Sequence, residues 1–169
     1  ALPEELPIEA ILVNPQHEDT HTALDDLSGV GVAFMLAVAM RTRLRERGFY
    51  SNRTEPNLRE YLDVVALGTL ADMAPLVGQN RILVEWGLKE LGQSRRPGIL
   101  AMLKSSGLED QATMKVEDVG FRLAPRINAA GRMASASDVI EMFLTADAER
   151  ARTIASQLQD FNSERQETE

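Results

Sequence analysis

The sequence contains no cysteine, which excludes both a disulfide framework and a metal site built from thiolates. Aromatic residues are scarce at 5% of the 169 residues, whereas hydrophobic residues make up 44% and charged residues 26%. This balance is typical of a soluble globular protein, and the chain is long enough to form one hydrophobic core. The lack of cysteine fits a reducing compartment, and we therefore expect a cytoplasmic protein.

Basic residues are outnumbered, and long hydrophobic runs are absent. The chain has 18 Lys and Arg residues against 26 Asp and Glu residues, which gives a net charge of -8. Its surface therefore cannot be basic throughout, and any contact with nucleic acid must come from a local patch. The longest apolar run, Val30 to Met40, has eleven residues, which is too short to span a bilayer.

Hydrophobic periodicity predicts a mostly helical chain, with about seven helices and one or two strands at the start. The short apolar run Ile8 to Val13 is followed by a turn signal and predicts a buried strand. A helix is predicted from Leu27 to about Arg47, and its first half is expected to be buried because it is apolar on every side. Trp86 is expected to lie in the core on a later helix.

The last part of the chain predicts one long helix. Its apolar residues recur at spacings of three and four, so they form a stripe on one face. The stripe consists of Ala148, Ala151, Ile154, Ala155, Leu158 and Phe161. The chain starts at Ala1 without a methionine and stops inside this helical pattern, so we expect it to be a piece of a longer protein.

Two acids interrupt the apolar run Asp63 to Leu76. A carboxylate buried among aliphatic side chains needs a cationic partner or a metal ion. Asp63 and Asp72 are nine residues apart, so they point to opposite faces of a regular helix and cannot bind one ion together. Asp72 stands three residues before Pro75, where the run ends, and its residue pattern leaves metal ligand and ion-pair partner equally open. For Asp63, early in the helix, an ion pair is favoured.

The stretch 124–133 combines Pro, Asn and Gly with two arginines, and its pattern predicts a turn rather than a helix. Arg126 and Arg132 flank small residues, and two guanidinium groups placed in this way can clamp a phosphate. Asn128 would add an amide donor. The alternative is that these arginines neutralise Asp63, Asp72 or Asp138.

Two further motifs are open to a structural explanation. Ser28, Gly29 and Gly31 begin a predicted helix, and free backbone N–H groups at such a position can bind an anion. Small residues there can equally serve close packing. His17 and His21 match the H-E-x-x-H zinc motif, but they lie in a polar stretch without helical periodicity. A solvated loop is therefore favoured over a zinc site at the two histidines.

Several longer stretches resemble one known family. They are ALPEELPIEAILVNP, LSGVGVAF, DVVALGTLADMAPL followed by GQNRILVEWGL, LAPRINAAGR, and LQDFNSERQETE. In the same order along the chain, they resemble segments of the RecJ family of single-strand-specific 5′→3′ DNA exonucleases, within the DHH phosphoesterase superfamily. The likeness covers nearly the whole chain, and several motifs in series make it specific.

The resemblance implies that residues 1–145 form the C-terminal portion of a DHH-type phosphoesterase domain with an α/β fold. Residues 146–169 would begin a connector helix toward a second domain. In this family two divalent ions, Mn²⁺ or Mg²⁺, are held by Asp and His from four motifs and activate water for phosphodiester hydrolysis. The GTLAD stretch resembles the fourth motif, which implies that Asp72 is a metal ligand and catalytic residue, with Asp63 as the alternative.

The resemblance also implies a role for the arginine-containing stretch. Arg126, Asn128 and Arg132 would hold the DNA phosphate near the metal ions. Single-stranded DNA is the implied substrate, and DNA repair and recombination, together with repair proteins as partners, are the implied setting. Exposed apolar surface on a chain without its sheet neighbours would favour self-association.

The chain departs from the family in one respect. The first three metal motifs, including DHH itself, would lie upstream of Ala1, and one ligand cannot build a two-metal site. We therefore expect the chain alone to be inactive. The alternatives are a non-catalytic scaffold and another phosphodiesterase of the superfamily. Asp72 argues against the scaffold, which needs no costly acid beside its core, and the APRINAAGR stretch and long last helix favour the exonuclease.

Overall fold

The computed structural model describes residues 11, 13–15, 24, 26–133 and 136–168. Within these ranges the chain contains seven α-helices of nine or more residues, so the prediction of a mostly helical fold is confirmed. No strand occurs in the described part of the chain. The predicted strand Ile8 to Val13 lies largely outside it, and Ile11 and Val13 have no regular secondary structure.

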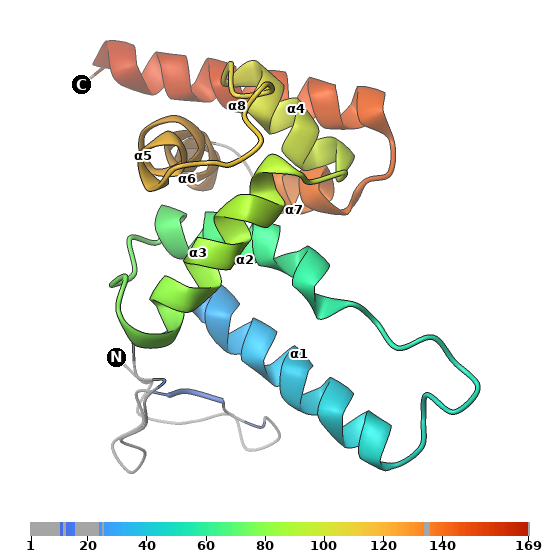
Figure 1. Ribbon diagram of the computed structural model, residues 1–169. Coiled ribbons are helices and arrows are strands. Elements are labelled where there is room, and N and C mark those ends of the chain that lie inside the picture. Colours follow the sequence, from blue (N-terminus) through green and yellow to red (C-terminus); the bar gives the residue numbers. More distant parts are fainter. Residues whose placement is uncertain (1–10, 12, 16–23, 25, 134–135, 169) are drawn as a thin grey trace.

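The helices follow one another along the chain, joined by turns and loops, as Figure 1 shows. The first elements are α1 (Gly29–Glu46), the 3-10 helix η1 (Leu58–Tyr61), α2 (Leu62–Ala71), α3 (Gly78–Gly92) and α4 (Pro97–Ser105). They are followed by α5 (Val116–Asp118), the π-helix η2 (Val119–Leu123), α6 (Ala124–Met133), α7 (Ala136–Leu144) and α8 (Ala148–Thr168). Among the helices described, none has both the length and the apolar character needed to cross a membrane.

The core forms around α2, which is apolar on almost every side. Val65, Ala66 and Leu67 are fully buried, and α2 packs against α1, α3, η2 and α6. Its approach to α3 is the closest: a Cβ atom at Gly87 would stand 2.3 Å from the carbonyl oxygen of Leu62, so only glycine permits it. Because an apolar helix is stable only when it is surrounded, this packing explains why α2 can carry the run that dominates the sequence.

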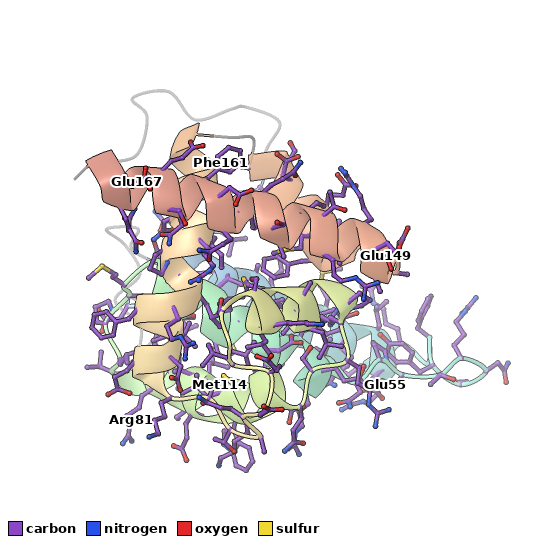
Figure 2. All side chains as sticks on the ribbon, turned by 90° about the horizontal axis from the view of Figure 1, so that it is seen from above. Glu55, Arg81, Met114, Glu149, Phe161 and Glu167 are labelled. Carbon is purple, nitrogen blue, oxygen red and sulfur yellow. The ribbon has the colours of Figure 1, made fainter. Side chains whose placement is uncertain are left out.

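The long helix α8 closes the other side of the core. Its apolar stripe packs on α4, α6 and α7, and Figure 2 shows α8 running along one side of the molecule from Glu149 to Glu167. The predicted stripe is confirmed, since its middle residues are fully buried. These residues are Ala151, Ile154, Ala155 and Leu158. The segment 146–169 thus shares the core of the preceding helices, and its role as a connector to a second domain stays a prediction.

The first half of α1 is not buried, and the prediction of its burial is wrong. Gly31 is the one buried residue of this helix, whereas Leu36, in its first half, is 45% exposed. The helix packs mainly against α2 and η1, so the described residues cover only one side of it. An apolar sequence predicts what a helix can be packed against, but the neighbours that are present decide its burial.

Trp86 was expected in the core, and this prediction is wrong as well, since the side chain is 45% exposed on α3. The Nζ atom of Lys89 lies 4.3 Å from the centre of the ring, and the guanidinium carbon of Arg59 lies 5.5 Å from it. Cations above an aromatic face are attracted by its negative charge density, so they stabilise the ring at the surface.

The stretch 124–133 is a helix, α6, and not the predicted turn. Proline inside a helix lacks an N–H donor, and its ring collides with the carbonyl four residues earlier. Here the wider π-helix η2 stands directly before Pro125, and the N–H of Ala124 bonds to the carbonyl of Val119, five residues back. The wider turn accommodates the ring, so the helix continues through a proline that local rules treat as its end.

Candidate functional site

Asp63 and Asp72 lie at the two ends of α2, and Asp72 is its C-cap. Asp63 stands in the first turn and is 2% exposed. Its carboxylate accepts hydrogen bonds from the Ser94 hydroxyl at 2.8 Å, from Arg96 Nε at 3.2 Å and from the Val64 N–H at 2.7 Å. The ion-pair interpretation of Asp63 is therefore confirmed, and its oxygens are already engaged by protein groups.

Asp72 is in a different situation, because it is exposed and forms the C-cap of α2. No hydrogen bond or ion pair joins its carboxylate to a side chain that the structure describes. The next residue, Met73, has a φ angle of 55°, a left-handed conformation that turns the chain away from the helix axis. The carboxylate of Asp72 is thus free to bind a ligand in solvent at the end of a buried helix.

Helix α6 reaches this same end of α2. The amide Nδ2 of Asn128 donates to the carbonyl oxygen of Ala71 at 3.2 Å, across 57 residues of sequence. Ala71 directly precedes Asp72, so the contact brings the predicted phosphate-binding stretch beside the predicted metal ligand. Asn128 is exposed, and one of its two amide protons is used in this contact. The second proton and the amide oxygen can face a ligand.

Arg126 and Arg122 form a pair of like charges one turn apart on the helix. Arg126 Nη1 donates to the carbonyl of Arg122, and its Nε atom is buried without a hydrogen-bond partner. Burial lowers the pKa of Arg126 from its usual value, and the positive charge of Arg122 acts in the same direction. Arg122 in turn donates to the carbonyls of Ser106 and Gly107 at the end of α4.

No described carboxylate neutralises these two arginines, because the hydrogen bonds that they donate go to backbone carbonyls. Several other arginines are paired with a carboxylate, and Arg150, for example, is held by both oxygens of Glu141 at 2.6 and 2.7 Å. In an acidic chain, Arg122 and Arg126 therefore form a local pair of positive charges without a described carboxylate partner. For Arg126, the alternative of neutralising a nearby acid is not observed. The side chain of Arg132 lies outside the described residues, so the two-arginine clamp stays a prediction.

Two of the three small residues at the start of α1, Ser28 and Gly31, make close contacts within the protein. The Ser28 hydroxyl caps the helix by accepting from the Gly31 N–H at 3.2 Å, and it also lies 2.8 Å from the Thr69 hydroxyl. A Cβ atom at Gly31 would stand 3.0 Å from the Leu27 side chain, whereas one at Gly29 would meet open space. These contacts favour the close-packing alternative, and the anion site at Ser28, Gly29 and Gly31 stays a prediction.

Asn80 supports the site, and our reading of the sequence missed it. The side chain is 1% exposed, and its Nδ2 atom donates to the carbonyls of Asp26 at 2.6 Å and Pro75 at 3.0 Å. Its oxygen accepts from the Ser28 N–H at 3.4 Å. Asn80 thus ties the loop after Asp72 to the start of α1. A polar residue on the first turn of an amphipathic helix was the available signal.

A cleft of about 800 Å³ lies at the other end of α2, beside Asp63. Two of the three arginines that line it are paired: Arg59 Nε lies 2.6 Å from Glu90, and Arg96 lies 3.2 Å from Asp63 and also stacks on Tyr61. Because Ser94 and Arg96 already engage Asp63, the cleft offers no free carboxylate from α2, and the candidate site stays at Asp72.

Asp72 alone cannot hold a metal ion. Across the described part of the chain, no three Asp, Glu or His side chains come together as a ligand set, and His17 and His21 lie outside that part. An exposed carboxylate does suit Mg²⁺ or Mn²⁺, which prefer hard oxygen ligands. The residues therefore fit a role as one contributor to a site whose other ligands come from elsewhere.

Comparison with known proteins places these residues in context. No family model matches the chain. The chain is 45% identical to the single-stranded-DNA-specific exonuclease RecJ of Dickeya dadantii over 98% of its own length, and 41% identical to that of Escherichia coli over 97%. It spans 29% of the length of each of these relatives.

Solved structures give the same result. A crystal structure of exonuclease RecJ bound to manganese matches with a TM-score of 0.77 and 34% identity, covering 98% of this chain and 39% of that one. A structure of RecJ in complex with Mg²⁺ from Thermus thermophilus matches with a TM-score of 0.68 and 39% identity, covering 82% of this chain and 20% of that one.

Proposed function

The chain is homologous over nearly its whole length to a segment of the RecJ single-stranded-DNA-specific exonucleases, and we propose that it is part of such an enzyme. In this proposal the segment supplies one metal-ligating carboxylate, Asp72, and a surface for the DNA phosphate on α6. The observation that carries the proposal is the hydrogen bond of 3.2 Å from Asn128 to the carbonyl of Ala71, which joins the two parts.

Each residue has a distinct task in the proposed reaction. Bound divalent ions, Mn²⁺ or Mg²⁺, would activate water and stabilise the leaving oxygen during phosphodiester hydrolysis. Asp72 provides one oxygen ligand from a rigid helix end, and Asn80 holds the loop that follows it. Arg126 binds the phosphate through a guanidinium that its bond to Arg122 already orients, which reduces the entropy lost on binding. Asn128 fixes the distance between phosphate and carboxylate.

The setting of the activity is part of the same proposal. We place the protein in the cytoplasm, where single-stranded DNA arises during repair and recombination, and where repair proteins would be its partners. The exposed apolar side chains Leu36 and Met40 on α1 support self-association of the chain when its other neighbours are absent.

The phosphate-binding role is tested by replacing Arg126 with alanine and measuring binding of a labelled single strand at several salt concentrations. We expect about tenfold weaker binding, because one charged hydrogen-bonded contact is lost. The logarithmic salt slope should fall by about 0.7, the value for one phosphate contact on a single strand. Arg150→Ala is the matched control, because Glu141 neutralises that arginine. Equal effects of the two substitutions would show that only net charge matters.

A second prediction concerns catalysis. The purified chain with Mn²⁺ should release no mononucleotides from a 5′-labelled single strand, because the described residues contain no complete metal site. The measurement is product release over time with metal-clean, nuclease-free protein. The prediction is contradicted if the wild-type chain releases mononucleotides and Asp72→Ala does not. That result would mean that the chain forms a complete metal site by itself.

A further inference from the structure

Phe121 is an aromatic side chain that the fold places on the surface. It is 80% exposed in the π-helix η2, although Val119 and Leu123 on either side are fully buried. Phe121 stands halfway between these two residues, so it points away from the core face of the helix. The neighbouring Gly120 has no side chain to shield the ring, and open space lies where its Cβ atom would be. An exposed phenylalanine forgoes about 2 kcal/mol of stabilisation that burial of its side chain would give, so its position calls for an explanation.

The ring lies close to the proposed site. Seven residues separate Phe121 from Asn128 on one continuous helical stretch formed by η2 and α6. Their separation along the axis is about 10 Å at the usual helical rise. Asn128 contacts the end of α2, and both η2 and α6 pack against α2. A ligand whose phosphate lies at Asn128 can therefore extend over Phe121.

The surrounding charges identify the kind of ligand. Arg122 follows Phe121 directly and Arg126 lies one turn further, and neither is neutralised by a described carboxylate. An apolar protein segment that covered the ring would remove uncompensated guanidinium charge from water, which is costly. A nucleotide avoids this cost, because its phosphate neutralises the charge while its base covers the ring. Aromatic rings that alternate with cations are typical of single-strand binding surfaces.

We propose that Phe121 is a stacking platform for an unpaired base of the DNA strand, and that it sets the preference for single strands. This inference rests on the proposed function and adds a specificity residue to it. A base in a duplex is stacked between its neighbours and cannot offer its face to the ring. Phosphate contacts from Arg122 and Arg126 are available to both kinds of DNA, so the ring is the group that distinguishes them.

The test compares binding of a fluorescein-labelled oligothymidylate, alone and in a duplex with oligoadenylate, by fluorescence anisotropy. Phe121→Ala should weaken single-strand binding about tenfold and leave duplex binding unchanged, since stacking on one aromatic ring contributes on the order of 1–3 kcal/mol per base. Phe121→Trp should keep wild-type affinity. Leu144→Ala is the matched control, because Leu144 is 79% exposed on α7 and lies outside η2 and α6.

The outcomes separate this inference from the function on which it rests. If Arg126→Ala weakens binding of the single strand but Phe121→Ala does not, the stacking role is overturned and the proposed function stands. Equal weakening of single-strand and duplex binding by Phe121→Ala would also overturn it, because the ring would then only position the arginines. If the wild-type chain binds neither DNA, the proposed function fails and the inference fails with it. Because the side chain of Phe121 is exposed, its variants should fold as the wild type does. Circular dichroism spectra of the variants check this.

Discussion

Replacing Asp72 with alanine in the full-length enzyme that we propose should reduce phosphodiester hydrolysis by roughly a thousandfold or more, because a metal ligand contributes several kcal/mol to transition-state stabilisation. The fold should be unaffected, since the side chain is exposed and forms no hydrogen bond or ion pair with a described residue. The measurement is the release of mononucleotides from a 5′-labelled single strand with saturating Mn²⁺, together with the thermal unfolding midpoint.

Two comparisons make this experiment specific. Asp160→Ala removes an exposed acid from α8 and should leave the rate unchanged. Asp72→Asn keeps the shape of the side chain but loses the charge, so it should recover little activity if the carboxylate binds a metal ion. A wild-type rate in Asp72→Ala would assign the ligand to another residue and remove the main chemical argument for the site.

Replacing Asp63 with alanine should instead lower the free energy of unfolding by about 2 to 3 kcal/mol. The substitution removes the acceptor of three donors, Ser94, Arg96 and the Val64 N–H, at a position that is almost fully buried. Breaking a buried ion pair costs about 3 to 5 kcal/mol. We expect a loss at or below the lower end of this range, because the side chain of Arg96 is 30% exposed and stays partly hydrated. Urea or thermal denaturation of the purified chain measures the change.

The same experiment separates the two acids of α2. In a protein of this size the expected loss corresponds to about 5 to 10 °C in the unfolding midpoint. Asp72→Ala serves as the matched control, because it removes the other acid of the run without removing a protein contact. Equal midpoints for Asp63→Ala and the wild type would mean that water replaces the ion pair at no cost, and Asp63 would then lose its structural role.

Much of the helical framework followed from local rules. The start of α4 at Pro97 and the stripe on α8 come from residue preference and periodicity, which act within a few residues. Helix geometry predicts that Asp63 and Asp72 cannot bind one ion together, and the structure places them at the two ends of α2. Their different roles were only partly predictable, because the partners of Asp63 lie on a loop more than thirty residues away.

Local rules failed where tertiary contacts outweighed them. Pro125 and its neighbours predict a turn, yet the π-helix before them allows α6 to continue. Trp86 and the apolar half of α1 predict burial, but cations cover the tryptophan ring and one side of α1 has no described neighbour. In each case the outcome depended on groups outside the local sequence window.

The sequence by itself determined where the helices lie, which faces are apolar, and that an acid stands at each end of the most hydrophobic one. Only the tertiary structure decided that α6 meets α2 at Asp72, that Asn80 holds the loop between α2 and α3, and that Phe121 faces outward. The physical reason is one of range. Helix formation depends on bonds between residues a few positions apart, whereas a binding surface depends on side chains brought together across many tens of residues by packing of the core.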